Sequence, residues 1–168
     1  IFARREFTLE SSVPYAELWI SAIPSYHLFV NGEHVGFGPA PATCNKTYAD
    51  NYDISPYLQP GNNTIGIIAS DAAIPVYSRF HHAPGIWCQL NIDNAPVLWT
   101  NESWRLYRAV CYEGGQPRCH AGIEFVEKIN FDTYPHGWNL NGFNDRHWER
   151  PVQKGISSHG CPVITPYG

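Results

Sequence analysis

The feature that most constrains the fold of this chain is the near absence of helical periodicity. No stretch of about a dozen residues keeps apolar side chains at positions i, i+3, i+4 and i+7 without an interrupting proline or glycine. Short runs typical of β-strands are frequent instead, and they return roughly every 8–12 residues. These runs occupy residues 5–10, 16–23, 63–70, 86–93, 95–100 and 103–110. The pattern predicts an all-β sandwich or barrel.

The most specific local signal is a hairpin over residues 26–37, with Asn31-Gly32 as its two-residue turn. A type I′ turn needs positive φ at both central residues, which this dipeptide tolerates well. In that register Leu28 faces Val35 across the two strands. We therefore expect an apolar face made of Tyr26, Leu28, Val35 and Phe37. The opposite, mixed face is then made of His27, Phe29 and His34.

Two further stretches carry turn signals. Ser55 is expected to cap a single helical turn with Pro56 at its first position. The Pro60-Gly61 pair then predicts a tight turn into a strand that begins near Thr64. Toward the end of the chain periodicity is lost, so we expect a β-sandwich domain over residues 1–155 and an exit linker over residues 156–168, leading to a downstream domain.

Composition narrows the class of protein. Of the 168 residues, 43% are hydrophobic and 15% charged, which excludes a disordered chain. The formal net charge of −4 offers no basic field, so we expect no nucleic-acid partner. No apolar run approaches the roughly 20 residues of a membrane span, so we expect no membrane partner. Since the chain begins without methionine, we expect a piece excised from a longer polypeptide, or a mature form.

Cysteines and glycosylation sequons bear on location. Cys111 and Cys119 bracket a turn-rich loop that a disulfide could close, and buried or free thiols are the alternative for the other three. No CxxC pair is present, so a structural zinc site is not expected. Sequons occur at Asn45, Asn62 and Asn101. These features favour a secreted or extracytoplasmic location, with the cytoplasm left open.

Four segments, in order, resemble one family: YHLFVNGEHVG, YDISPYLQPGNNTIGI, WTNESWRLY and GWNLNGFNDRHWERPV. Together they look like the N-terminal galactose-binding-like β-sandwich of bacterial α-L-rhamnosidases of glycoside hydrolase family 78. They are similar, more loosely, to the sugar-binding domain of family 2 β-galactosidases and β-glucuronidases. The resemblance covers nearly the whole chain. It implies a jelly-roll β-sandwich of two antiparallel sheets with short helical turns.

The resemblance also implies a function. Such domains are non-catalytic and accompany a catalytic domain downstream, so the expected partners are carbohydrate, either L-rhamnose or galactose, and other domains of the same polypeptide. Some members hold L-rhamnose with a calcium ion through an Asp-Asn pair just past the hairpin, so calcium is the one cofactor suggested. Here Asn45 matches the asparagine, but Cys44 occupies the aspartate position. The nearby Asp50-Asn51 pair is expected inside the next strand.

The residues themselves do not predict catalysis or a histidine metal site. Acidic residues are scattered, and turns and caps explain those at positions 33, 53, 93, 132 and 145. No GxSxG or HExxH motif is present. The eight histidines lack a tight ligand spacing, and the side chains of adjacent His81 and His82 diverge if they lie on a strand. A self-contained hydrolase nevertheless stays a hypothesis that an assay can decide.

Sugar binding requires an aromatic ring for the apolar face of a pyranose, and polar groups for its hydroxyls. One long segment between two predicted strands offers both, and its candidate sugar-binding residues are Asp71, Tyr77, Arg79, His81, His82 and Trp87. Asn45, which the resemblance implies, is the seventh candidate. The alternative is that the aromatic residues of the long segment only pack the end of a structural, ligand-free interdomain sandwich. Trp104, Trp138 and Trp148 are expected to be core or interdomain anchors. Any single-sugar site would be weak, of order millimolar to high micromolar.

Overall fold

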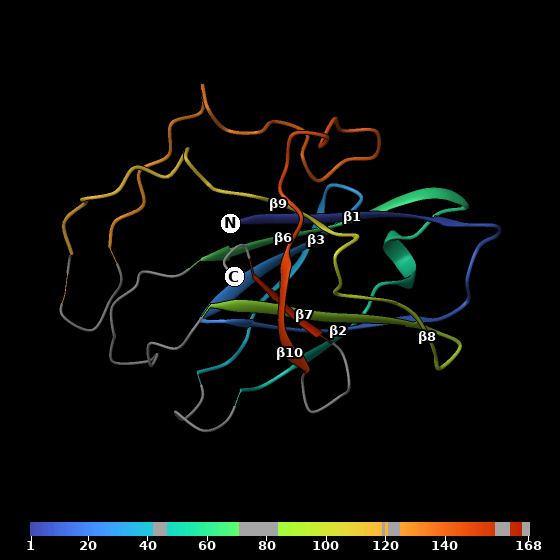
Figure 1. Ribbon diagram of the computed structural model, residues 1–168. Coiled ribbons are helices and arrows are strands. Elements are labelled where there is room, and N and C mark those ends of the chain that lie inside the picture. Colours follow the sequence, from blue (N-terminus) through green and yellow to red (C-terminus); the bar gives the residue numbers. More distant parts are fainter. Residues whose placement is uncertain (42–46, 71–83, 119, 121–124, 157–161, 166–168) are drawn as a thin grey trace.

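The chain forms a sandwich of two antiparallel sheets, as Figure 1 shows for the computed structural model. The structure describes residues 1–41, 47–70, 84–118, 120, 125–156 and 162–165. Within these residues a single 3-10 turn, η1 (Ser55–Tyr57), is the whole helical content, and no helix is long and apolar enough to cross a membrane. The predicted all-β sandwich is therefore confirmed.

Each sheet collects strands from distant parts of the sequence. The first has the order β4-β3-β6-β1-β9 and contains β1 (Phe2–Leu9), β3 (Ser25–Val30), β4 (Glu33–Gly38), β6 (Gly61–Ser70) and β9 (Arg105–Tyr107). The second has the order β10-β11-β7-β2-β5, with β8 also paired to β7, and contains β2 (Ala16–Ile23), β5 (Asp50–Asp53), β7 (Gly85–Ile92), β8 (Ala95–Trp99), β10 (Val152–Ile156) and β11 (Pro162–Thr165).

The main core lies between the two sheets and follows the predicted alternation. In β2, Leu18, Ile20 and Ala22 are buried, while the residues between them are partly exposed. They share one hydrophobic cluster with Leu28 of β3 and Trp104. Since each large apolar side chain buried in this way contributes about 1.5–3 kcal/mol, the period-two pattern is also the main source of stability.

A second cluster covers the outer face of the first sheet. The segment 130–149, orange in Figure 1, runs above β1 and buries Trp138 and Trp148. Phe2 lies beneath, with its ring centroid 4.9 Å from that of Trp138, and Cys111 completes this outer cluster. All three tryptophans expected as anchors are thus buried within the domain.

The hairpin has the predicted turn but a different register. Asn31 and Gly32 both have positive φ (50° and 92°), as a type I′ turn requires. A bulge at Val35 then makes Leu28 face Gly36 instead of Val35. Phe37 consequently lies on the outer face with His27 and is 70% exposed, so its predicted place on the apolar face is wrong.

The bulge has a packing cause. Gly36 and Gly38 occupy the inward positions of β4, where a Cβ would collide with the Tyr52 ring and with the Asp50 carboxylate respectively. The sandwich therefore places these two glycines inward, and the extra residue in the strand turns the side chains of His34 and Phe37 outward. This contact involves residues far away in the sequence, which a hairpin rule cannot include.

Three other expectations also change. Ser55 is no side-chain cap, because its Oγ accepts the Ala16 N–H (2.8 Å) and donates to Asp53. The linker predicted after residue 155 includes β11, whose Ile164 pairs with β7 and is fully buried. Cys111 is a free thiol in the structure, while Cys119, its suggested disulfide partner, lies outside the described residues.

Candidate functional site

A cavity of about 500 Å³ opens at one end of the sandwich. Antiparallel pairing brings this end together: β2 ends at Ile23 opposite Gly85, where β7 begins, and β6 ends at Ser70 opposite Ser25. We call this the end cavity, and the residues that line it are Ile1, Ile23, His27, Ile68, Ala69, Ser70, Pro84, Gly85, Ile86, Arg108, Ala109, Tyr112, Glu127 and Ile164.

The wall of the end cavity combines apolar strand residues with a few polar groups. Arg108 and Glu127 supply the two signs of charge, and both residues are exposed. Ser70 is held by Ser25, with the two hydroxyl oxygens 2.7 Å apart. Burial, with Glu127 nearby, raises the pKa of Tyr112 to about 12. Its phenol can donate a hydrogen bond.

This wall is chemically suited to bind a small polar molecule. Volumes of about 300–1,000 Å³ and largely apolar walls with a few convergent polar groups are typical of small-molecule sites. A guanidinium and a carboxylate can together donate to and accept from neighbouring hydroxyls. Among the described residues, no group of three or more histidine, cysteine or acidic side chains could hold a metal ion, so calcium stays a prediction.

The candidate residues from the sequence fall mostly beyond what the structure describes. Six of them lie outside the described residues: Asn45, Asp71, Tyr77, Arg79, His81 and His82. Five of them, all except Asn45, belong to the segment between Ser70 and Pro84, and these two flanking residues line the end cavity. Trp87 lies on β7 opposite Ser21 and is only 4% exposed, so its ring is packed within the chain.

Sequence reasoning missed the other polar groups of the end cavity: His27, Arg108, Tyr112 and Glu127. A signal for one of them existed, because Arg108 lies in the predicted strand over residues 103–110, and it directly follows β9 in the structure. Its relevance depends on β9 pairing with β1 at the edge of the first sheet, which no local pattern specifies.

The Asp-Asn pair of the calcium hypothesis lies where it was expected. Asp50 and Asn51 begin β5 and pair with β2. The Asp50 carboxylate accepts a hydrogen bond from the buried Tyr26 hydroxyl at 2.5 Å, and the Asn51 amide donates to Glu17 at 3.0 Å. Both side chains therefore have structural partners within the domain.

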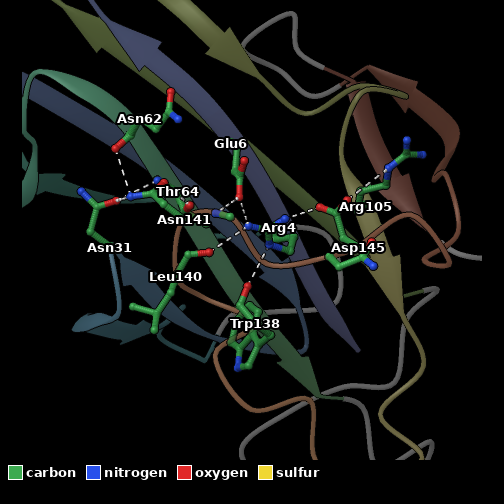
Figure 2. A network of polar contacts seen from close by, with 12 residues as sticks. Arg4, Glu6, Asn31, Asn62, Thr64, Arg105, Trp138, Leu140, Asn141 and Asp145 are labelled. Carbon is green, nitrogen blue, oxygen red and sulfur yellow. Dashed lines mark hydrogen bonds and ion pairs between the residues drawn. The ribbon is translucent and has the colours of Figure 1, made fainter.

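A second polar site surrounds Arg4 on β1 (Figure 2). This side chain is 1% exposed and forms ion pairs with Glu6 and Asp145. Its Nε donates to the Trp138 carbonyl at 2.8 Å, and Nη2 donates to the Leu140 carbonyl at 3.0 Å. Two carboxylates thus share one guanidinium through charge-assisted hydrogen bonds.

Asparagines extend this network to the hairpin. Asn141 donates to the Asn31 side chain at 3.2 Å and to the Asn62 carbonyl at 3.0 Å, while Thr64 donates to Asn141 at 2.7 Å (Figure 2). The network therefore fixes the segment 130–149 on the first sheet. The assignment of Asp145 to a turn alone is wrong, because its carboxylate forms this buried ion pair.

Known proteins are similar to this chain in sequence. The sequence model of one family, the α-L-rhamnosidase N-terminal domain, matches residues 11–161. An α-L-rhamnosidase of Formosa agariphila is 38% identical over 71 residues, which make up 40% of this chain and 8% of the relative. Another from the same organism is 24% identical over 170 residues, covering 88% of this chain and 17% of the relative. The chain therefore spans less than a fifth of either relative.

Solved structures agree with this. The family 78 rhamnosidase of Bacillus sp. GL1 has a TM-score of 0.84 at 30% identity, over 89% of this chain and 16% of that one. A Streptomyces avermitilis α-L-rhamnosidase complexed with L-rhamnose has a TM-score of 0.60 at 19% identity, over 89% and 15%. A Pleurotus ostreatus lectin in complex with GalNAc has a TM-score of 0.54 at 20% identity, over 98% of this chain and 41% of that one. The last two comparisons support the fold alone.

Proposed function

Because the chain belongs to the α-L-rhamnosidase N-terminal domain family, we propose that it is the non-catalytic accessory domain of a larger α-L-rhamnosidase and binds a sugar weakly in the end cavity. The observation that carries the proposal is the end cavity itself, with Arg108 and Glu127 on a largely apolar wall. Ser70 and Pro84, which flank the predicted sugar-binding segment in the sequence, both line this cavity, and this supports the proposal.

A non-catalytic role is supported by the carboxylates. Retaining and inverting glycosidases place two carboxyl groups roughly 5–10 Å apart around the scissile bond. In the described part of the chain, Glu127 is the one carboxylate that lines the end cavity. Glu6 and Asp145 do converge, but on Arg4, whose guanidinium forms an ion pair with each of them. An aryl-glycoside assay with the isolated chain tests this: turnover would show a self-contained hydrolase.

NMR titration of the 15N-labelled 168-residue chain tests the sugar site directly, since it detects millimolar binding. L-rhamnose, D-galactose and D-glucuronic acid are added separately, with and without calcium. We expect shifts at Ser70, Gly85 and Ala109 that saturate in the millimolar to high micromolar range for one sugar. Arg108→Ala and Glu127→Gln should each abolish them, whereas Arg146→Ala, an exposed cation elsewhere, should not. Absence of shifts for every sugar would overturn the binding role.

A second candidate role is to position the other domains of the same polypeptide. Four large apolar side chains, Phe37, Val110, Phe131 and Ile156, are between 61% and 71% exposed. Exposed apolar side chains of this size are candidates for contact with neighbouring domains when several occur on one small domain. Serine at these positions in the full-length enzyme should lower its thermal stability while leaving that of the isolated chain unchanged.

A further inference from the structure

Two histidines of the hairpin face each other across its strands. His27 lies on β3 and His34 on β4, and the Nδ1 atom of His27 is 3.2 Å from the Nε2 atom of His34. Both side chains are exposed on the outer face of the first sheet. Seven residues separate them in the sequence, so no short ligand spacing reveals the pair.

The separation of the two nitrogens has a chemical meaning. Imidazole nitrogens bind zinc at about 2.0–2.1 Å, so two of them on one tetrahedral ion lie about 3.3 Å apart. The observed 3.2 Å matches this separation. In the described arrangement the nitrogens share a hydrogen bond. When an ion binds, the donating ring moves its proton to its other nitrogen, and both facing nitrogens turn a lone pair toward the ion after a small rotation of the rings. Because imidazole is a borderline ligand, Cu²⁺, Ni²⁺ and Zn²⁺ are the ions that it suits.

The hairpin holds both rings in place. The His34 ring packs at 5.2 Å from the Phe29 ring, and the His27 ring packs at 6.0 Å from that of Phe37. The bulge at Val35 pairs His34 with Phe29 and Phe37 with His27, so that all four side chains share the outer face. Sites built on strands are more precisely ordered than sites on loops, which lowers the entropic cost of binding an ion.

We propose that His27 and His34 form a solvent-accessible binding site for one divalent transition-metal ion, with two imidazole ligands and the remaining positions open to water. In the part of the chain that the structure describes, no group of three or more histidine, cysteine or acidic side chains could hold an ion, so the proposal uses these two imidazoles. An open bidentate site binds less tightly than a closed four-ligand structural site and exchanges its ion readily. His27 also lines the end cavity, but the inference does not rest on sugar binding, because its partner is His34 and its probe is a metal ion.

The test uses the tag-free 168-residue chain with Cu²⁺ alone, because copper has the highest affinity among these ions. Electron paramagnetic resonance should show two bound nitrogens in the wild type and fewer in His27→Ala and in His34→Ala. Calorimetry should show the affinity of this site weakened at least about tenfold in each variant. His136→Ala, an exposed histidine on the segment 130–149, is the matched control and should bind as the wild type does.

The double variant sharpens the test. If both histidines hold one ion, His27→Ala/His34→Ala should lose little more affinity than either single variant, because either change already destroys the chelate. Circular dichroism and thermal melting should show all variants folded, since both side chains are exposed. The proposal is overturned if the nitrogen coupling and the affinity are the same in the wild type and both single variants. The proposal is equally contradicted if the losses of binding free energy in the two single variants add up in the double variant, since this indicates two separate ions.

Discussion

The guanidinium of Arg4 forms a buried ion pair with the carboxylate of Asp145, although 141 residues separate the two in the sequence. Arg4 lies in the first strand, while Asp145 belongs to the segment that covers the first sheet. The pair therefore couples the start of the sandwich to its outer cluster, and Glu6 and two carbonyl groups complete the coordination of the guanidinium.

Asp145→Ala should lower the free energy of unfolding by about 1.5–3 kcal/mol, because it leaves a buried guanidinium with less compensation. Urea denaturation followed by tryptophan fluorescence measures this change. Asp132→Ala is the matched control, since Asp132 is an exposed acid on the same segment. Equal losses in the two variants would contradict a stabilising role for the pair.

Gly36→Ala should destabilise the domain by about 1–3 kcal/mol, because its Cβ would overlap the Tyr52 ring of the facing sheet. Gly114→Ala is the control, since a Cβ there meets nothing within 4 Å. Thermal melting of both variants provides the comparison. If Gly36→Ala melts with the wild type, the tyrosine moves aside at little cost and the packing explanation of the bulge fails.

The strands could be predicted because their signal is local. β2 has the bounds of its period-two run, and the Asn31-Gly32 turn has the conformation that this dipeptide favours. The bulge could not be predicted, because it depends on Tyr52 of the other sheet approaching Gly36. The rule for hairpin register counts residues within two strands and contains nothing about the facing sheet.

Of the end cavity, sequence reasoning pointed only to the part near the long segment that follows Ser70. The length and composition of the segment after Ser70 predicted a binding loop, and the residues that flank it, Ser70 and Pro84, line the end cavity. Arg108 and Glu127 reach the same cavity from other parts of the chain, so their meeting follows from topology and not from spacing. The same holds for Arg4, whose two carboxylate partners include one at the opposite end of the sequence.

The Tyr26 hydroxyl should make stability depend on pH in the alkaline range. Burial, with a hydrogen bond to Asp50, raises its pKa well above the ordinary value near 10. The folded state thus retains a proton that the unfolded state releases above pH 10, so the free energy of unfolding falls as pH rises past 10. Below pH 10 this contribution is fully present.

Tyr26→Phe tests this by removing the titrating group. At pH 8 it should cost about 1.5–3 kcal/mol through the lost hydrogen bond to a carboxylate. Between pH 10 and 11 its urea midpoint should fall less steeply than that of the wild type. Tyr112, whose pKa is also raised, is present in both proteins and cancels in the comparison. Parallel pH profiles would contradict the assignment to Tyr26.

Cys111 should resist alkylation in the folded protein. It is fully buried in the outer cluster, and burial raises the pKa of its thiol, so less of the reactive thiolate is present at pH 8 than in the unfolded chain. Iodoacetamide should therefore modify it at least about a hundredfold more slowly in buffer than in guanidinium chloride. Peptide mass spectrometry follows each cysteine separately.

Cys88 is an internal control for this experiment, because it is equally buried but belongs to the main core. Trp148→Leu loosens only the outer cluster, to which Trp148 and Cys111 both belong. It should accelerate the modification of Cys111 more than that of Cys88, since local opening exposes one cluster without the other. Equal acceleration of both cysteines would show that the two clusters open together, and the outer cluster would then be part of one cooperative unit with the sandwich.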